Sequence, residues 1–256
     1  TYHASVAEKC IRKKKHVFIE KPITSTIEEA DKLLALAKKN KVIVQVGHIE
    51  RLNPALRALE PYKINPKFIE IQRLAPYNTR GTDVPVVLDK MIHDIDIVLS
   101  LVDSKVRSIS ASGLSILTDS IDIAHAQIKF ENGCVSSITS SRIAKDEVRK
   151  IKTFQQNLYS TVDLYKGLTE VYTVSKKGLD KKSFLMSVPF NYKNKTRHII
   201  YEKPTIIKED ALKLELINFT NSMKGLEMPI VSGQSGREAL NVAIEIQEKI
   251  IKGFIS

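Results

Sequence analysis

The sequence predicts an α/β chain in two parts: a short doubly wound parallel sheet with helices, and then a mainly antiparallel, open-faced α+β sheet with helices on one face. Over residues 1–47, apolar runs of strand length alternate with apolar residues at helical spacing, a pattern typical of parallel sheets. Between residues 106 and 175, apolar and polar residues alternate with period two, and turn residues separate the segments. Such segments form antiparallel sheets that have one covered face.

The first part is expected to contain two helices and two strands in alternation. Their expected ranges, in chain order, are 2–14, 16–20, 26–40 and 42–46. Thr26 stands three residues before Glu29, which is the capping-box spacing that starts a helix. The series begins on a helix with no strand before it, and no G-x-G-x-x-G occurs in the chain. We therefore expect residues 1–50 to be the C-terminal half of a Rossmann-type dinucleotide-binding domain, with the N-terminal half missing from this chain.

Residues 51–256 are expected to form a substrate-binding and oligomerisation domain. It opens with a helix, a strand and a second helix, at 54–59, 67–73 and 86–102. Six alternating strands are expected next, at 106–117, 121–130, 135–142, 150–156, 159–165 and 170–175. Residues 178–197 are rich in Lys and Asn and are expected to be a surface loop. Two closing helices, at 208–223 and 236–254, can pack back on the first part.

Composition restricts the class of protein. The chain has 256 residues, of which 43% are hydrophobic and 27% charged, as in ordinary globular proteins, and no apolar run has the length of a membrane span. The net charge of +11 raises the question of a nucleic-acid partner, but the basic residues are scattered and no aromatic residues are interleaved with them. Cys10 and Cys134 are too few for a disulfide framework or a metal cluster. We expect two free thiols in a cytoplasmic protein that has no metal site, no nucleic-acid partner and no membrane contact.

A lysine stands at the end of the first strand. The run His16–Pro22 is a short apolar strand that stops at Glu20, Lys21 and Pro22. Ligands of open α/β sheets bind just beyond the carboxyl ends of the strands, so Lys21 is a candidate site residue. The alternative is an exposed lysine in an ordinary loop between a strand and a helix.

Two further stretches carry polar residues at suggestive positions. Asp89 and His93 are four residues apart, so on a helix they share one face, where a carboxylate can orient an imidazole and favour its charged form. The alternative is a helix with two surface polar residues. The loop from Gly47 to Pro54 follows the second strand directly, which places its polar side chains at the mouth of any cleft there. It also reads as an ordinary loop, with Asn53 capping a helix.

Taken together, these segments resemble the glucose–fructose oxidoreductase and inositol dehydrogenase family of NAD(P)-dependent dehydrogenases. The resemblance rests on a strand ending in Glu-Lys-Pro, a strand followed by Gly-His-x-Glu-Arg-x-Asn-Pro, an Asp-x-x-x-His pair and a large antiparallel sheet, in this order. Thr1-Tyr-His3 is similar to the family's segment that borders the cofactor. A second Glu-Lys-Pro at 202–204 is not followed by an α-β-α pattern, and we interpret it as a coincidence.

The resemblance implies roles for individual residues. The catalytic residues are expected to be Lys21, Asp89 and His93, with His93 as the base that takes the hydroxyl proton and Lys21 as the cation near the developing alkoxide. The cofactor is expected to be NAD, with NADP not excluded, and its expected contacts are Thr1, His3, Glu20, Lys21 and His48. Seven polar residues are expected to bind the sugar and its diphosphate: Glu50, Arg51, Asn53, Arg73, Tyr77, Asn78 and Arg80.

Within the family, the segments around residues 47–55 and 73–97 look most like bacterial UDP-N-acetylglucosamine 3-dehydrogenases. This likeness implies oxidation of the sugar's C3 hydroxyl on a nucleotide-sugar substrate, in the synthesis of amino sugars for lipid A or other surface glycans. It also implies a homodimer or homotetramer that packs through the C-terminal sheet. Two alternatives remain: a dehydrogenase of another sugar or polyol, and a non-catalytic oligomeric scaffold without the cofactor fingerprint.

Overall fold

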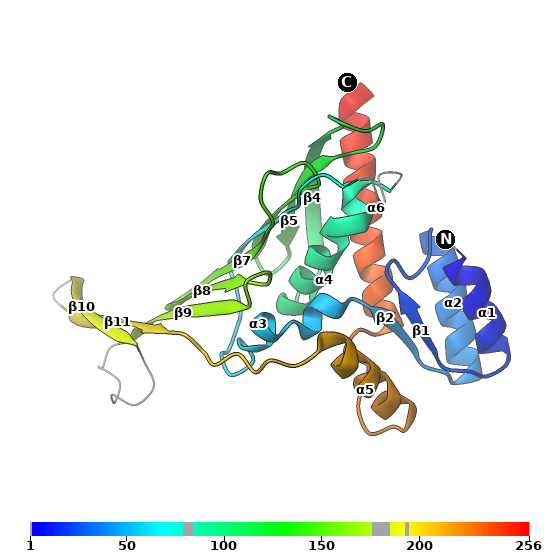
Figure 1. Ribbon diagram of the computed structural model, residues 1–256, viewed down its shortest axis with the longest axis horizontal. Helices are drawn as coiled ribbons and strands as arrows, with labels where there is room; N and C mark the ends of the chain where they lie inside the picture. Colours follow the sequence, from blue (N-terminus) through cyan, green and yellow to red (C-terminus); the bar gives the residue numbers. More distant parts are fainter. Residues whose placement is uncertain (1, 79–83, 176–184, 193–194, 256) are drawn as a thin grey trace.

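Two sheets organise the molecule (Figure 1). The computed structural model describes residues 2–78, 84–175, 185–192 and 195–255. A two-stranded parallel sheet joins β1 (Val17–Glu20) to β2 (Val44–Gly47), and a nine-stranded sheet has the order β10-β11-β9-β8-β7-β3-β6-β5-β4. The predicted sequence of a small parallel sheet followed by a large, mainly antiparallel one is confirmed.

The small sheet is flanked by two helices, α1 (His3–Arg12) and α2 (Ile27–Asn40). The backbone N–H of Glu29 donates to the side chain of Thr26, as the capping-box spacing predicts. The strands run in register, so that Glu20 at the end of β1 lies beside Gly47 at the end of β2. Both carboxyl ends therefore reach the same edge, where ligands of parallel sheets bind.

Short helices occur between residues 49 and 101. They are the 3₁₀ helix η1 (Ile49–Leu52), α3 (Pro54–Arg57), the π-helical turn η2 (Val87–Met91) and α4 (Ile92–Leu101). The predicted helix over 86–102 is confirmed in its extent, and its first turn is wound as a π-helix. Asp89 lies in this turn and His93 in the next, so the simple spacing of an α-helix does not describe them.

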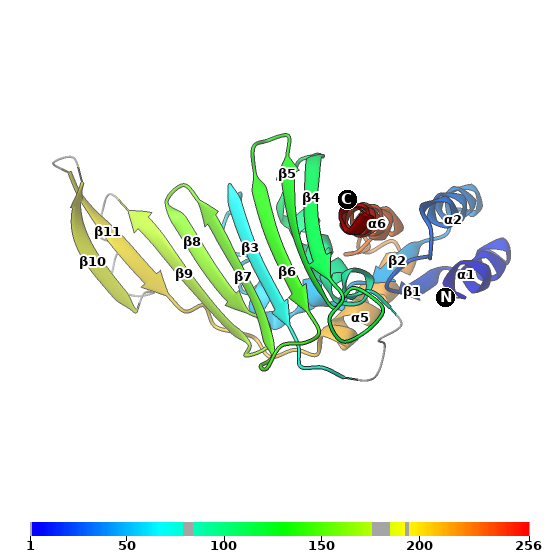
Figure 2. The same cartoon turned by 90° about the horizontal axis from the view of Figure 1, so that it is seen from above.

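The large sheet fans out beside the helices (Figure 2). Its strands are β3 (Phe68–Leu74), β4 (Val106–Leu114), β5 (Ile123–Phe130), β6 (Val135–Ser141), β7 (Val148–Gln155), β8 (Leu158–Asp163), β9 (Leu168–Ser175), β10 (Met186–Tyr192) and β11 (Lys195–Glu202). Strand β3 is parallel to β6 and antiparallel to β7, and the other neighbours are antiparallel. Inserting β3 between β6 and β7 brings the end of β3 beside the start of β7.

The expected surface loop at 178–197 is wrong where the structure describes it. Met186–Tyr192 and Lys195–Glu202 form a hairpin whose second strand extends the sheet next to β9. Residues 176–184 and 193–194 lie outside the described part. The apolar residues Met186, Val188 and Phe190 alternate with period two, and this alternation has more influence on the backbone than the Lys- and Asn-rich composition.

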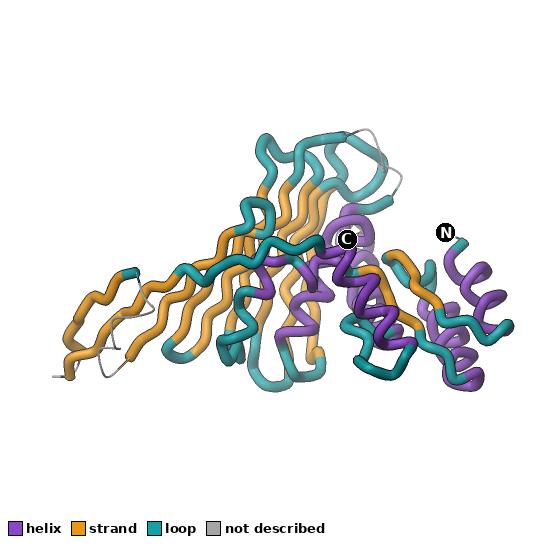
Figure 3. Tube along the Cα trace, turned by 60° about the horizontal axis from the view of Figure 1, so that its bottom comes forward, coloured by secondary structure: helices purple, strands orange, loops and turns teal. Residues whose placement is uncertain are grey.

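One long helix, α6 (Gly233–Ile255), joins the two parts. Its buried residues Ala243, Ile246 and Ile250 belong to the core of the large sheet, whereas Leu240 belongs to the core of the small sheet. The helices cover one end of the large sheet, and the strands at the other end extend beyond them (Figure 3). The prediction of helices on one face of the large sheet is confirmed.

Helix α5 (Ala211–Met223) lies beside the small sheet, where Phe219 meets Phe18 of β1 edge to face at 5.8 Å between ring centroids. Glu215 of α5 is 1% exposed, and one of its carboxyl oxygens has no hydrogen-bond partner in the described structure. Burial, together with the nearby carboxylates Glu20 and Asp96, raises the pKa of Glu215 to about 7. An acid of this kind is protonated in the folded protein at mildly acidic pH.

We predict that Gly236→Ala destabilises the fold. A Cβ atom at position 236 of α6 would lie 2.5 Å from Cγ2 of Val46 in β2, so the helix would have to move away from the strand. The expected loss is about 1–3 kcal/mol of unfolding free energy, the usual cost of overpacking, measured by urea denaturation. Gly253→Ala, in the same helix with nothing within 4 Å, is the matched control and should not lose stability. Equal stability of the two variants would contradict the close packing of α6 on β2.

We predict that Glu215→Gln stabilises the protein at alkaline pH. The folded protein holds a proton that the unfolded chain releases above pH 4.5, so the contribution of Glu215 to stability falls as the pH rises from 4.5 through about 7. The glutamine resembles the protonated acid and does not titrate. The variant should gain roughly 1–3 kcal/mol near pH 8 and nothing near pH 4, as measured by denaturation at both values. A gain of the same size at both values would show that Glu215 does not titrate as described.

Candidate active site

A pocket of about 250 Å³ lies where β1, η1, β3, η2, α4 and β7 meet. It is lined by Lys21, Ile49, Glu50, Arg73, Ala75, Asp89, Lys90, His93, Glu147 and Arg149. The three predicted catalytic residues, Lys21, Asp89 and His93, line it together although they come from two distant segments of the chain. Predicted substrate residues Glu50 and Arg73 are also part of its wall.

Lys21 lies at the carboxyl end of β1, before a cis peptide bond to Pro22. Its Nζ donates to the backbone oxygen of Asp89 at 2.5 Å and reaches the Oδ1 of the same residue at 3.3 Å. These bonds tie the end of the small parallel sheet to the π-helical turn η2. Asp89 therefore has Lys21 as its partner, and no hydrogen bond links Asp89 to His93 among the described contacts.

His93 is a neutral imidazole in this setting. Its Nδ1 is buried and has no hydrogen-bond partner in the described structure. Burial is the main reason that the pKa of His93 lies well below its ordinary value, and the positive charges of Arg73 and Lys21 lower it further. The expectation that Asp89 favours the charged form of His93 is wrong, because the ring is buried and faces positive charges, while Asp89 is paired with Lys21. A neutral imidazole can accept a proton.

Arg73 and the carboxylates that it binds form a buried group of charges at the pocket. Its guanidinium donates to both carboxylate oxygens of Asp94 at 2.9 and 2.8 Å and to Oε1 of Glu50 at 2.9 Å. Burial alone would raise the pKa of Glu50, but the charge and hydrogen bond of Arg73 lower it below its ordinary value. Three of the donor positions of this arginine are thus used inside the protein.

The other predicted substrate residues are placed differently. Arg51 donates to Asp96 through two nitrogens, at 2.6 and 2.7 Å, and Asn53 caps α3 while its amide donates to Glu50 at 3.1 Å. Neither lines the pocket, and neither do Tyr77 and Asn78. Thr1 and Arg80 lie outside the described residues.

Three charged residues of the pocket wall were not predicted from the sequence: Lys90, Glu147 and Arg149. Arg149 is the second residue of β7 and lies between the carboxylates of Glu147 at 2.9 Å and Glu50 at 3.4 Å. It comes to the pocket because β7 pairs with β3, which sets Arg149 opposite Arg73. The period-two pattern of β7 marks a strand, but nothing in it indicates which strand becomes the neighbour.

The expected cofactor residues lie around the end of the small sheet. The carboxylate of Glu20 rests against Gly47, where a Cβ would lie 3.0 Å from its Oε2, so glycine leaves room for this carboxylate at the sheet edge. His3 contacts the backbone oxygen of Pro22 through Nδ1 at 2.8 Å, and His48 is buried behind the pocket. An exposed carboxylate beside a lysine suits ribose hydroxyls and a nicotinamide, and the residues present fit that end of NAD. The sequence contains no glycine-rich loop for the pyrophosphate.

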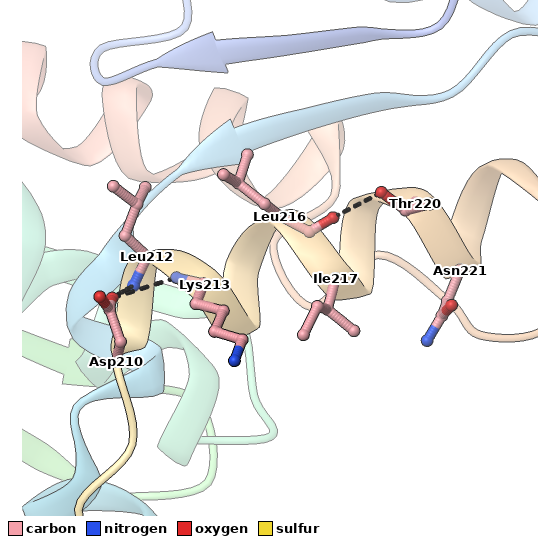
Figure 4. A pocket seen from close by; sticks show the side chains of 7 residues that line it. All are labelled: Asp210, Leu212, Lys213, Leu216, Ile217, Thr220 and Asn221. Atoms are coloured by element: carbon pink, nitrogen blue, oxygen red, sulfur yellow. Dashed lines mark hydrogen bonds between the residues drawn. The ribbon is translucent and has the colours of Figure 1, made fainter.

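Within the described ranges, no three or more His, Cys, Asp or Glu side chains are grouped so that they could hold a metal ion. The described helices include none that is long and apolar enough to cross a membrane. A separate cavity of about 470 Å³ runs along α5 and is lined only by residues of that helix and its N-cap, Asp210 (Figure 4). It shares no residue with the pocket of Lys21 and His93.

Comparison with known proteins identifies relatives of the whole chain. Residues 1–48 match the family described as "Oxidoreductase family, NAD-binding Rossmann fold", and residues 71–155 match the GFO/IDH/MocA C-terminal domain. UDP-N-acetylglucosamine 3-dehydrogenase of Acidithiobacillus ferrooxidans is 30% identical over 96% of this chain and 74% of its own length. Myo-inositol 2-dehydrogenase of Thermotoga maritima is 25% identical over 93% of this chain and 71% of its own length.

The fold agrees with these matches. A solved structure of UDP-N-acetylglucosamine 3-dehydrogenase from Acidithiobacillus ferrooxidans superimposes with a TM-score of 0.85 at 29% identity, over 97% of this chain and 75% of that one. The likeness spans both sheets and so includes every element that contributes to the pocket. The chain belongs to the GFO/IDH/MocA family of NAD-binding oxidoreductases.

Proposed function

We propose that this oxidoreductase is an NAD-dependent dehydrogenase that oxidises a secondary hydroxyl of a sugar, namely the C3 hydroxyl of UDP-N-acetylglucosamine. The observation that carries the proposal is the meeting of Lys21, Asp89 and a neutral His93 in one pocket beside the carboxyl end of a parallel sheet. Oxidation of an alcohol needs a base for the hydroxyl proton and a cation near the oxygen, and these residues supply both.

Each side chain has a defined task in this reaction. His93 accepts the proton of the substrate hydroxyl, which its lowered pKa permits at neutral pH. Lys21 stabilises the negative charge that develops on the oxygen, and Asp89 holds Lys21 in place through two hydrogen-bond contacts. Bound NAD would supply the hydride acceptor, so the alcohol becomes a ketone when its carbon-bound hydrogen leaves as a hydride and its hydroxyl hydrogen leaves as a proton. Glu20 and Lys21, with His3 nearby, are the residues proposed to hold the nicotinamide end of the cofactor. His48 is only 1% exposed, which leaves little of its ring to contact a cofactor.

The size and charge of the pocket favour a sugar ring. Its volume of about 250 Å³ is just below the usual range for ligand pockets, so it suits one ring, and the nucleotide would lie outside it. The wall carries both cations and carboxylates, which suits hydroxyl groups that both donate and accept hydrogen bonds. We propose Glu50, Arg73 and Arg149 as contacts of the sugar, and Arg51, Asn53, Tyr77, Asn78 and Arg80 as contacts of the rest of the substrate.

A second candidate is the oxidation of a free polyol, which the 25% identity to a myo-inositol 2-dehydrogenase favours. The two substrates are distinguished by following NADH formation with UDP-N-acetylglucosamine, N-acetylglucosamine and myo-inositol at equal concentrations. Turnover of the nucleotide sugar alone supports the proposal, and turnover of myo-inositol alone contradicts it.

The product ketone suits amino-sugar synthesis for surface glycans. Since Cys10 and Cys134 are free thiols, we place the reaction in the reducing cytoplasm.

The open face of the large sheet is the proposed oligomer interface. An aromatic ladder, Phe68, Phe154, Tyr159, Tyr172 and Tyr201, crosses strands β3, β7, β8, β9 and β11 with ring centroids 4.8 to 5.7 Å apart. Their sequence neighbours Ile69, Val171 and Ile200 are fully buried on the other face, so the ladder lies on the side away from the core. Stacked aromatic rings on an exposed sheet face are a typical contact surface, and a second copy of the chain is the occupant we propose.

We predict that His93→Ala lowers kcat by a factor on the order of 10²–10⁴, the usual effect of losing a general base, and leaves NAD affinity nearly unchanged. Lys21→Ala should weaken both NAD binding and turnover, because its ammonium lies between the cofactor edge and the pocket. Since the pKa of His93 is well below 6.5, kcat should fall only at pH values well below 6.5. Steady-state NADH formation measures these effects, with Lys38→Ala on exposed α2 as control. Full activity of His93→Ala would show that another residue is the base.

We predict that Tyr172→Glu converts the oligomer into a monomer. Tyr172 is the middle of the ladder, with rings 5.4 and 4.8 Å away on either side, and a carboxylate there would be buried without a partner in the interface. Light scattering at micromolar concentration measures the mass. Tyr165→Glu, at an exposed turn outside the ladder, is the matched control and should keep the wild-type mass. A monomeric wild-type protein would contradict the proposed interface.

A further inference from the structure

Two imidazole rings meet behind the wall of the pocket. His48 follows β2 and His93 lies in the first turn of α4, and their ring centroids are 5.9 Å apart with the planes at 85°, an edge-to-face contact. His48 is 1% exposed, and neither of its ring nitrogens has a hydrogen-bond partner in the described structure. A buried polar group without a partner costs about 1–3 kcal/mol, so its presence calls for a functional reason.

A catalytic histidine is usually oriented by a carboxylate or carbonyl that binds its second ring nitrogen. The acidic residues near His93 are engaged elsewhere. Asp89 binds Lys21, Asp94 binds Arg73, and Asp96 binds Arg51. The Nδ1 of His93 has no partner in the described structure, so the ring contact with His48 is the interaction left to orient His93.

We propose that His48 is a positioning residue for His93: its ring packs edge to face against the catalytic imidazole and fixes the plane of that imidazole. The inference rests on the proposed function in one respect, namely that His93 is the base. Edge-to-face aromatic contacts are weak but directional, and one of them favours a ring orientation by roughly two- to tenfold. The burial of His48 keeps its own ring in place.

The charges around the pair fit a neutral contact. His48 faces Lys21 from β1, Arg51 from η1 and Asp96 from α4, and burial is the main cause that lowers the pKa of His48. His93 faces Lys21, Arg73 from β3, Arg149 from β7 and His48 itself. A carboxylate against Nδ1 of His93 would raise the pKa of the base, whereas a neutral ring orients His93 and leaves it unprotonated.

Variants of His48 separate the ring from its nitrogens. His48→Phe keeps an aromatic ring without nitrogen atoms, and His48→Ala removes the ring. We expect His48→Ala to lower kcat on the order of tenfold with little change in the KM for NAD, and His48→Phe to recover most of the lost kcat. If the alanine variant fails to fold, His48→Leu replaces it, because leucine fills the space without a flat ring. His125→Ala, which removes an exposed imidazole on β5, is the control.

A second readout needs no substrate. In NMR spectra of the protein, the ring signals of His93, assigned by their loss in His93→Gln, should stay sharp and unshifted in His48→Phe and should broaden or shift in His48→Ala. Unchanged His93 signals and unchanged kcat in His48→Ala would overturn the inference. A phenylalanine variant as weak as the alanine variant, with a raised KM for NAD, would also overturn it and would assign His48 to cofactor binding. If no sugar is oxidised at all, the proposed function fails and the NMR result alone decides the role of His48.

Discussion

The geometry of the pocket depends on how helix α6 packs against both sheets. Lys21 lies at the end of a strand of the small sheet, and His93 lies in helix α4, which packs on the large sheet. The distance between the two side chains therefore depends on how firmly the two parts are held together. Gly233 and Gly236 let α6 touch Leu34, Val44 and Val46, while its far half buries Ile246 and Ile250 in the large core. Each fully buried Ile contributes about 1.5–3 kcal/mol. The exposed ion pair between Arg237 of α6 and Asp31 of α2 is screened by solvent and contributes little, so apolar packing sets the position of the helix.

The buried charged side chains next to the pocket are paired with one another, which distinguishes them from the groups that can react. Arg73 and Arg51 neutralise Asp94 and Asp96, two acidic residues of α4 that are almost completely buried. Removing either arginine would leave an unpaired buried carboxylate, which typically costs 3–5 kcal/mol. The wall of the pocket also carries the Lys21–Asp89 pair and the neutral ring of His93, the groups proposed to act on the reacting hydroxyl.

The sequence predicts much of this arrangement and fails where long-range contacts decide. A strand that ends in Glu-Lys-Pro is enough to place Lys21 at a sheet edge, and the apolar pattern around His93 is enough to place it on a buried helix. The partner of Asp89 was missed because the bond to Lys21 joins residues 68 positions apart. Arg51 and Arg73 suggested phosphate binding, since a linear sequence does not show that Asp94 and Asp96 face them. Arg149 was missed because the neighbour of its strand is set by the order of the sheet.

The central claim is that the pocket of Lys21, Asp89 and His93 holds the reacting carbon of a sugar. The most direct measurement is a crystal structure of the protein with NAD and UDP-N-acetylglucosamine bound. The account predicts that the C3 hydroxyl oxygen lies within hydrogen-bond distance of a ring nitrogen of His93, roughly 2.6–3.2 Å, with Lys21 in contact with the same oxygen. A sugar ring bound elsewhere, or one that presents no hydroxyl to His93, would contradict it.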